Sequence, residues 1–290
     1  MITELINIED GNFKPTKTNL ELSKEFEQSK IDLTKQAQRP PLAISIGLDE
    51  KDYGGVYYPL RFGTYGNISL ITGEEKSRKS FLKSLLEACA IGGKANNYTN
   101  NIDIKGHDLE DKYIISIDAE QDTYDAWLNG IRIPKMVGSL HPKYLVLKWR
   151  EKSKAERLDL LEWLFMESSY KDNLGLVMLD GYVDFVKDFN NLEECDEFTS
   201  RLMKYSSICK CHISGILHLN PNSEKSRGHL GTILGQKCET VVIIKDMGDY
   251  SLVTCKRGRG KKFKDFTMRI DDDSMPYVSD DLINDELLLT

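Results

Sequence analysis

A lysine and a serine, Lys79 and Ser80, stand where an apolar segment gives way to an amphipathic one. This arrangement aims backbone N–H groups and a helix N-terminus at a phosphate chain, with Lys79 reaching the terminal phosphates and Ser80 binding Mg²⁺. The segment matches the phosphate-loop pattern GxxxxGK[ST] except at Arg78, which replaces the second glycine. The residues expected to bind ATP are Gly73, Glu74, Glu75, Lys76, Ser77, Arg78, Lys79, Ser80 and Phe81.

Arg78 is the one departure from this pattern. A side chain at this position could crowd the nucleotide or add a positive charge to its binding site. Taken alone, the motif is equally compatible with an ordinary charged turn between a strand and a helix. The other polar residues that follow apolar runs therefore decide how the motif is interpreted.

The apolar run LGLVMLD ends at Asp180, about a hundred residues after Lys79. An aspartate at the carboxyl end of a buried parallel strand lies beside the phosphate loop and can hold a Mg²⁺-bound water. Such an aspartate is also a common way to begin a loop, but its combination with Lys79 favours the metal role. We therefore expect ATP and Mg²⁺ as cofactors, with Ser80 and Asp180 as the metal-binding residues.

A further apolar run, IISID, lies between these two and brings Asp118, Glu120 and Gln121 to the same edge of the expected sheet. ATP hydrolysis needs a carboxylate that orients and polarises the attacking water. Glu120 is the candidate for this role. Asp118 is the alternative, and both could instead cap the next helix.

The run ISGILHL places His218 and Asn220 at this edge as well. A polar group there can sense the γ-phosphate and pass the signal to loops that touch DNA. A lone histidine at a strand end is more often a hydrogen-bonded surface residue, but the order of the runs favours the sensing role for His218.

These polar residues need a scaffold of alternating strands and helices. Apolar runs and amphipathic stretches alternate along the chain, which is typical of an α/β fold with a mostly parallel central sheet. The expected strands are residues 67–72, 113–118, 144–149, 174–180 and 212–219. The expected helices are residues 79–91, 123–130, 154–170 and 192–208. After Glu239, three shorter runs separated by turns predict an antiparallel extension.

The ends of the chain differ from this middle part in composition. Residues 1–42 are polar and predict an arm or linker, with a helix over 20–38 that ends before two prolines. The ATPase domain is expected over 43–270. Residues 271–290 carry seven acidic side chains and no basic one, and predict an acidic tail.

The overall composition excludes several classes of protein. A net charge of −7 argues against a globally basic nucleic-acid coat. The six cysteines form no CxxC pair, so neither a zinc ribbon nor a disulfide framework is indicated. No stretch approaches the roughly 18 to 20 apolar residues of a membrane helix, and the first residues do not resemble a signal peptide. We expect a soluble, cytoplasmic protein without a membrane partner.

Several segments together resemble the RecA/DnaB superfamily, in particular the RepA-like hexameric replicative helicases and related AAA-type ATPases of plasmids, phages and mobile elements. The resemblance implies a RecA-like P-loop core, assembled as a hexameric ring or filament of identical subunits with ATP at each interface. It also implies tolerance of Arg78, since arginine before Lys-Ser/Thr is familiar in this branch. The segments that carry the resemblance are ITGEEKSRKSF, IDAEQ, WREKSKAERLDLLEWL, LVMLDGYVDFVKDFNN, ILHLNP and RGHLGTILGQKCETVV.

A strongly basic segment, residues 256–264, carries six positive side chains among nine. The resemblance implies that one subunit supplies such cations to its neighbour's γ-phosphate, which makes hydrolysis depend on assembly. Lys256, Arg257 and Arg259 are the candidates. The alternatives are direct binding of nucleic-acid phosphates and an ordinary solvated hairpin.

In this family the region matching residues 220–234 faces the central channel. Lys225, Arg227 and His229 are therefore candidate contacts to single-stranded DNA. A surface loop without a ligand is an equal alternative, because no aromatic residue there could stack on bases.

Two functions follow from these expectations. The first is an oligomeric Mg-ATP-dependent motor that moves on single-stranded DNA and separates the duplex, working with replication or loading factors. The second is an ATP-binding scaffold that grips DNA or loads partners with little unwinding. A third reading, a nucleotide-binding module made catalytically poor by Arg78, is less favoured.

Overall fold

The computed structural model describes residues 17–36, 38–49, 57–220 and 226–281. The chain divides into two compact units, residues 1–39 and 40–290. Within the described residues, no helix combines the length and the apolar character that crossing a membrane requires.

The first unit contains one helix, α1 (Asn19–Gln28), in its described part. A capping box starts it, in which the Thr18 hydroxyl accepts from the backbone N–H of Glu21 and the Glu21 carboxylate accepts from that of Thr18. The expected extension to Gln38 is wrong. No side chain of α1 is buried, and a short helix without a packed face has little to hold further turns in place.

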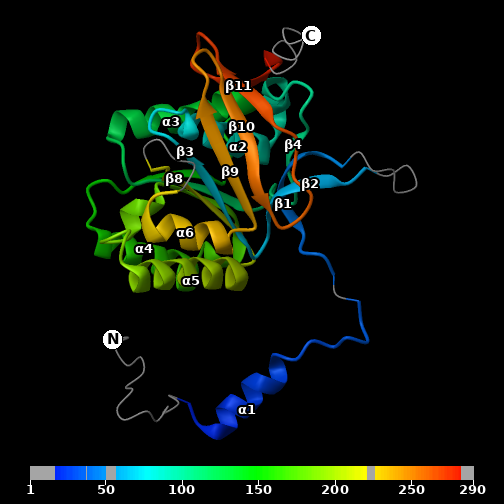
Figure 1. Cartoon of the computed structure of the whole chain (residues 1–290), viewed down its shortest axis with the longest axis vertical. Helices are drawn as coiled ribbons and strands as arrows, with labels where there is room; N and C mark the ends of the chain where they lie inside the picture. The colour runs from blue at the N-terminus through cyan, green and yellow to red at the C-terminus, as the bar shows by residue number, and fades with distance from the viewer. Residues whose placement is uncertain (1–16, 37, 50–56, 221–225, 282–290) are drawn as a thin grey trace. The chain divides into compact units, whose positions relative to one another are not determined.

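The second unit is built on a sheet of nine strands among the described residues (Figure 1). The six strands from β9 to β6 are mutually parallel, and β10, β11 and β12 continue the sheet in antiparallel pairing. This confirms an α/β fold with a large, mostly parallel sheet. In spatial order the strands are β12 (Pro276–Ser279), β11 (Phe266–Ile270), β10 (Ser251–Gly258), β9 (Thr240–Asp246), β3 (Ile68–Gly73), β8 (His212–His218), β7 (Leu174–Asp180), β5 (Tyr113–Asp118) and β6 (Tyr144–Lys148).

Two expectations about the end of the chain need correction. The antiparallel extension begins one strand later than expected, because β9 pairs with β3 in parallel and only β10 reverses direction. The acidic tail was expected from residue 271, but β12 pairs with β11 within that stretch. Buried Pro276 and Val278 alternate there with partly exposed neighbours, which is the pattern of a strand covered on one face.

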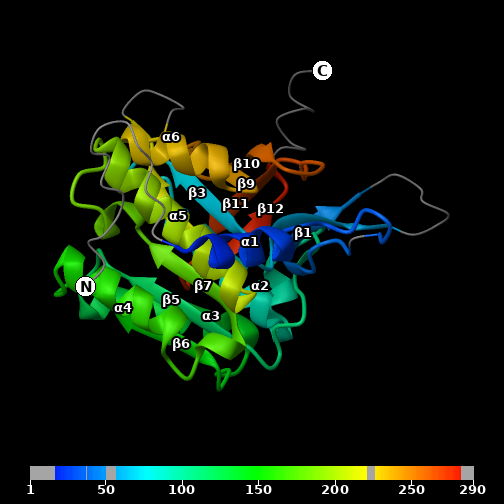
Figure 2. The ribbon, with the colours of Figure 1, turned by 90° about the horizontal axis from the view of Figure 1, so that it is seen from below.

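Helices cover both faces of this sheet. Figure 1 shows α2 and α3 on one face and α4, α5 and α6 on the other, and the view from below shows α5 between α4 and α6 (Figure 2). The α-helices of this unit are α2 (Lys79–Ile91), α3 (Thr123–Val137), α4 (Lys154–Met166), α5 (Leu192–Cys209) and α6 (Gly228–Lys237). Three short 3₁₀ helices complete them, η1 (Gly93–Tyr98), η2 (Lys171–Asn173) and η3 (Tyr182–Phe185).

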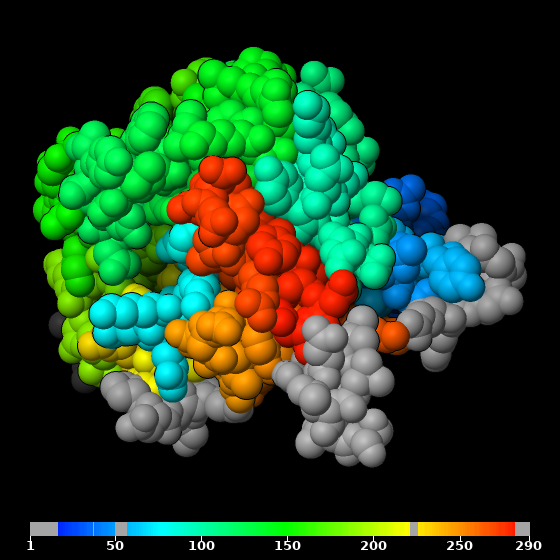
Figure 3. Space-filling view, turned by 90° about the horizontal axis from the view of Figure 1, so that it is seen from above, coloured from blue at the N-terminus to red at the C-terminus, as the bar shows by residue number. Residues whose placement is uncertain are grey.

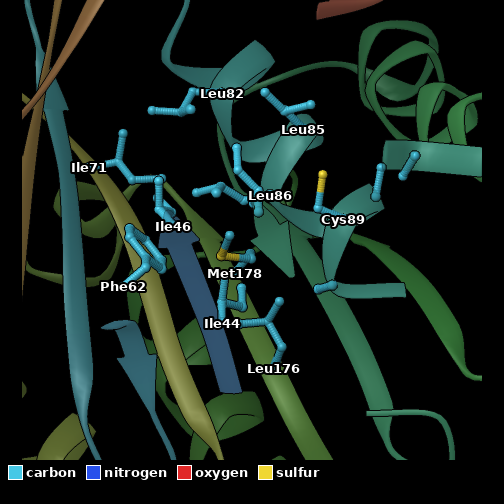
Figure 4. Close-up of a cluster of buried hydrophobic side chains, with 14 of the residues drawn as sticks. Ile44, Ile46, Phe62, Ile71, Leu82, Leu85, Leu86, Cys89, Leu176 and Met178 are labelled. Atoms are coloured by element: carbon cyan, nitrogen blue, oxygen red, sulfur yellow. The ribbon is translucent and has the colours of Figure 1, made fainter. Parts of the chain in front are cut away.

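Each layer buries its own apolar cluster. On the α2 side, Leu82, Leu85 and Leu86 pack against side chains from β3 and β7 such as Ile71 and Met178 (Figure 4). On the opposite side, the second cluster combines aliphatic side chains of the strands with aromatic residues of α4, η3 and α5. Burying large aliphatic and aromatic side chains contributes roughly 1.5–3 kcal/mol each. The first cluster therefore fixes α2 on its face of the sheet, and the second fixes α4, α5 and α6 on the other.

A second, three-stranded sheet packs against α2 and was not foreseen. It consists of β2 (Pro59–Thr64), β1 (Leu42–Leu48) and β4 (Ile104–Gly106), in that order. The sheet packs through Ile44, Ile46 and Phe62, which belong to the apolar cluster on the α2 side (Figure 4). Gly106 allows this contact, because a Cβ there would lie 2.1 Å from the backbone oxygen of Ala90 at the end of α2.

Two helix ends also differ from the expectation. Helix α3 continues past Gly130 to Val137, and Gly130 proves to be a packing residue, since a Cβ there would lie 2.8 Å from Val146 of β6. Helix α4 ends at Met166 rather than Tyr170, where the hydroxyl of Ser168 bonds the carbonyl of Leu164 as the chain turns toward β7.

Candidate nucleotide site

Parallel strands place their carboxyl ends at one edge of the sheet, and this edge collects the expected polar residues. In register, Gly73 of β3 lies beside His218 of β8, and Asp118 of β5 lies beside Asp180 of β7. The loop that follows Gly73 and the start of α2 stand above these strand ends. Ligands of open α/β sheets bind in such crevices outside the carboxyl ends of the strands.

The loop from Gly73 to Lys79 is wrapped tightly. A Cβ on Gly73 would lie 2.4 Å from the carbonyl oxygen of Ile244 in β9, so only glycine allows this approach. Lys79 is buried, with 5% of the residue exposed, and its ammonium group donates to the carbonyl oxygen of Glu74 at 2.5 Å. Burial lowers the pKa of Lys79 to about 8, against the opposing effect of Asp180 and Glu120. Lys79 is therefore a desolvated cation inside a curved backbone.

Arg78 holds the conformation that suits the glycine it replaces. Its φ of 69° and ψ of 29° lie in the left-handed region, immediately before α2. The guanidinium group points to the turn between β9 and β10, donating to the Asp246 carboxylate at 2.9 Å and to the Gly248 carbonyl at 2.6 Å. It also donates to the Tyr250 carbonyl and the Ser251 hydroxyl. The charge of Arg78 is thus bound to the hairpin between β9 and β10.

Ser80 and Asp180 meet in the structure, although a hundred positions separate them. The Ser80 hydroxyl donates to Asp180 Oδ2 at 3.0 Å. Burial raises the pKa of Asp180, as does neighbouring Asp118, while Lys83 lowers it. This pairing joins the start of α2 to the end of β7.

Lys83, one turn after Lys79, is 2% exposed and was missed in the sequence. Its ammonium group lies 3.9 Å from both Asp180 and Glu87. Burial lowers the pKa of Lys83, but Glu87 and Asp180 outweigh that effect and raise it overall. Lysines are common on helices, so only the tertiary contacts reveal this buried ion cluster.

Glu120 and Asp118 take different positions. Asp118 is buried, and its Oδ1 accepts from the backbone N–H groups of Glu120 and Gln121 at 3.0 and 2.8 Å. Glu120 is exposed at the rim of the site. Surrounding atoms still desolvate its carboxylate in part, and this effect, together with the negative charge of Asp180, raises the pKa of Glu120. Neither residue caps the next helix, because Asp122 does so by accepting from two backbone N–H groups.

His218 faces the same site from the end of β8. Its Nδ1 is buried without a hydrogen-bond partner among the described residues. Burial lowers its pKa, and the positive charge of Lys79 acts in the same direction. The side chain is therefore a neutral imidazole with an unused polar atom, close to Lys79.

These residues line one recess with a cavity volume of about 400 Å³. Figure 3 shows it as a hollow between the loop from Gly73 to Lys79, coloured cyan, and the green segment that begins α3. Its lining includes Lys79, Ser80, Glu120, Asp180 and His218. On the α3 side it also includes Gln121, Asp125, Leu128, Asn129 and Arg132, of which only Gln121 stood out in the sequence.

Comparison with known proteins adds no relative to this description. No family model matches the chain, and no curated protein matches it with significance. The function must therefore be argued from the site itself.

The basic segment, residues 256–264, lies near the amino-terminal ends of the parallel strands, opposite to the edge that carries the recess. Gly258 of β10 pairs with Thr240 of β9, which pairs with Ser69 near the start of β3. From Ser69 to Gly73 the strand rises about 13 Å. The guanidinium of Arg257 donates to the Gly235 carbonyl at 3.0 Å, and that of Arg259 to Asn67 Oδ1 at 3.2 Å. Lys256, Arg257 and Arg259 are thus not brought to the recess of their own chain.

The three candidate DNA contacts have different outcomes. Lys225 lies outside the described residues. The guanidinium of Arg227 stacks on the Phe189 ring, with 4.8 Å from its central carbon to the ring centroid. His229 is exposed, but it belongs to α6 and not to a loop. The expected loop is wrong from Gly228 onward, because Leu230, Ile233 and Leu234 are buried and stabilise a helix.

Proposed function

We propose that this chain binds ATP with Mg²⁺ and hydrolyses it, on a RecA-like P-loop core. The contact between Ser80 and Asp180 carries the proposal. It joins the residue after the phosphate-loop lysine to a strand-end carboxylate one hundred positions away, which a chance match to a short motif does not produce. Arg78 does not argue against it, since its guanidinium is bound elsewhere.

The donor set fits Mg²⁺. This ion prefers hard oxygen ligands and takes only one or two from the protein when it binds with a phosphate substrate. Ser80 and Asp180 offer a hydroxyl and a carboxylate 3.0 Å apart. The described residues contain no cluster of three or more His, Cys, Asp or Glu side chains suited to a tightly held metal. Bound Mg²⁺ would neutralise phosphate charge in this recess.

The chain's own residues supply the remaining steps. Lys79 exchanges its bond to the Glu74 carbonyl for the terminal phosphate oxygens. Glu120, whose raised pKa makes it a better base than an ordinary glutamate, orients a water toward the γ-phosphorus. As the water oxygen bonds to phosphorus and the bond to ADP breaks, the water proton passes to Glu120. His218 contacts the γ-phosphate through its unused nitrogen and reports its loss to β8.

At the level of the whole protein, we propose an oligomeric motor on single-stranded DNA. Its support is the position of the basic segment, which is remote from its own recess and exposes part of its charge for a neighbouring subunit. The alternative is an ATP-binding scaffold that holds DNA without moving on it.

Steady-state ATP hydrolysis tests the core of the proposal. Lys79→Ala is expected to abolish nucleotide binding, whereas Glu120→Gln keeps binding and lowers turnover by about 10²- to 10⁴-fold. Glu193→Gln, which removes an exposed acid from α5, is the matched control and should hydrolyse ATP like the parent. Parent-like turnover in Glu120→Gln would refute the assigned base.

The same assay separates the motor from the scaffold. Single-stranded DNA should stimulate turnover of the parent severalfold if ATP hydrolysis drives movement. Tight ATP binding with DNA-independent, negligible turnover would instead support the scaffold.

A further inference from the structure

Arg132 of α3 lines the recess, and no motif in the sequence points to it. Its guanidinium lies over the ring of Phe81, with 4.0 Å from the central carbon to the ring centroid. Phe81 directly follows the Ser80 hydroxyl that contacts Asp180. The cation is thus held beside the first turn of α2, where backbone N–H groups of a phosphate loop receive phosphates.

The guanidinium is fixed in place but only partly used. Its Nε donates to the Ser274 carbonyl at 3.1 Å, and its Nη1 donates to Asn129 Oδ1 at 2.5 Å. Both partners are neutral. A guanidinium carries five N–H donors, so three remain without an acceptor among the described residues.

The charge of Arg132 also lacks a counter-ion. None of the described carboxylates forms an ion pair with it, and burial lowers the pKa of the group. A half-buried cation that keeps its charge without a carboxylate is stabilised by an anion when one enters the recess. By contrast, Lys83, a buried cation of α2, already has Glu87 and Asp180 beside it.

We propose that Arg132 binds the phosphate chain of the nucleotide, within the same subunit that supplies Lys79. This inference rests on the proposed function and adds a residue to it. The planar fork of free N–H groups suits two phosphate oxygens, which a lysine at this position would contact as a point charge only. Arg132 therefore contributes to affinity for the polyphosphate and not to recognition of the base.

The test measures equilibrium binding of ATP and of inorganic tripolyphosphate to the full chain. Arg132→Gln is expected to weaken both ligands by about tenfold or more, and Arg132→Lys to recover part of the loss. Lys135→Gln removes an exposed charge from the last turn of the same helix and should change either affinity by less than about twofold.

Tripolyphosphate distinguishes a phosphate contact from other roles. If Arg132→Gln weakens ATP but leaves tripolyphosphate unchanged, the residue contacts the base or ribose and the inference is wrong. If urea unfolding without ligand shows that Arg132→Gln does not fold, binding of both ligands is measured in Phe81→Leu instead. Loss of the ring that orients the guanidinium should weaken both ligands about threefold, and unchanged binding would overturn the inference.

Lys79→Ala separates this inference from the proposed function. If the parent binds ATP, Lys79→Ala does not bind it and Arg132→Gln binds it as tightly as the parent, only the role of Arg132 is contradicted. A parent that binds neither ATP nor tripolyphosphate contradicts both.

Discussion

Replacing Arg78 separates the effect of its backbone conformation from that of its side chain. Arg78→Gly removes both the left-handed strain and the four hydrogen bonds to the hairpin between β9 and β10. Arg78→Ala removes the same bonds but keeps a Cβ in the left-handed region. The difference in stability between the two variants therefore isolates the backbone at this position.

The size of the difference can be estimated. A left-handed conformation costs a residue with a Cβ about 1–2 kcal/mol. Glycine avoids this cost, but the greater conformational freedom of its unfolded chain lowers the stability of the folded state by roughly 0.5–1 kcal/mol. We expect Arg78→Gly to exceed Arg78→Ala by about 1 kcal/mol in free energy of unfolding. For a unit of this size the difference corresponds to about 2–4 °C in Tm.

Urea unfolding of both variants and the parent measures this difference. The parent should be the most stable of the three proteins. Its free energy of unfolding should exceed that of Arg78→Ala by about 2 kcal/mol, because partly exposed hydrogen bonds to a charged group contribute modestly. ATP affinity of Arg78→Gly should stay within about threefold of the parent, since the guanidinium is directed to the hairpin. An alanine variant as stable as the glycine variant would refute the left-handed assignment and the strain argument with it.

Two further predictions concern buried charge. Lys83→Met leaves Glu87 and Asp180 without their buried cation and should lower the free energy of unfolding by about 3 kcal/mol. Urea unfolding should show less than additive loss on adding Glu87→Gln, and full additivity would contradict the ion cluster. Burial lowers the pKa of His212 to about 4, so below pH 6.5 the unfolded chain takes up a proton that the folded chain rejects. Stability should therefore fall by about 3 kcal/mol as the pH drops from 6.5 toward 4. His212→Asn should lack this part of the pH dependence, and an identical slope in both proteins would exclude His212 as its source.

The parallel strands and α2 could be predicted because their signals are local. A strand covered on both faces is a continuous apolar run, and β5, β7 and α2 begin and end where the sequence indicates. The clustering of strand-end residues follows from the same topology, since parallel strands share one edge. The expected grouping of Lys79, Asp180 and His218 required no other information.

The missed elements depend on contacts that are distant in the sequence. Helix α6 occupies a glycine- and serine-rich stretch that predicts a loop, but Gly231 allows close approach to the backbone of Ser226 while its apolar neighbours pack on the sheet. Arg132 acquires its place from Phe81, Asn129 and the Ser274 carbonyl, which come from two helices and a β-turn. Asn129 lies three residues before Arg132 on the same helix, but no spacing rule links this pair to Phe81 or to Ser274, so only the folded chain brings all of them together.

The positions of the cations assign nucleotide affinity and the rate of hydrolysis to different groups of residues in the proposed ATPase. Arg132 and Lys79 both line the recess of their own chain, so under the proposed function nucleotide affinity would be a property of the single subunit. Arg257 and Arg259 lie at the far end of the sheet and are held there by the Gly235 carbonyl and Asn67. Under the same proposal, these arginines would act on the reaction of a neighbouring subunit. On this reasoning an isolated chain binds ATP with full affinity but hydrolyses it slowly, and assembly raises the turnover rate without raising the affinity.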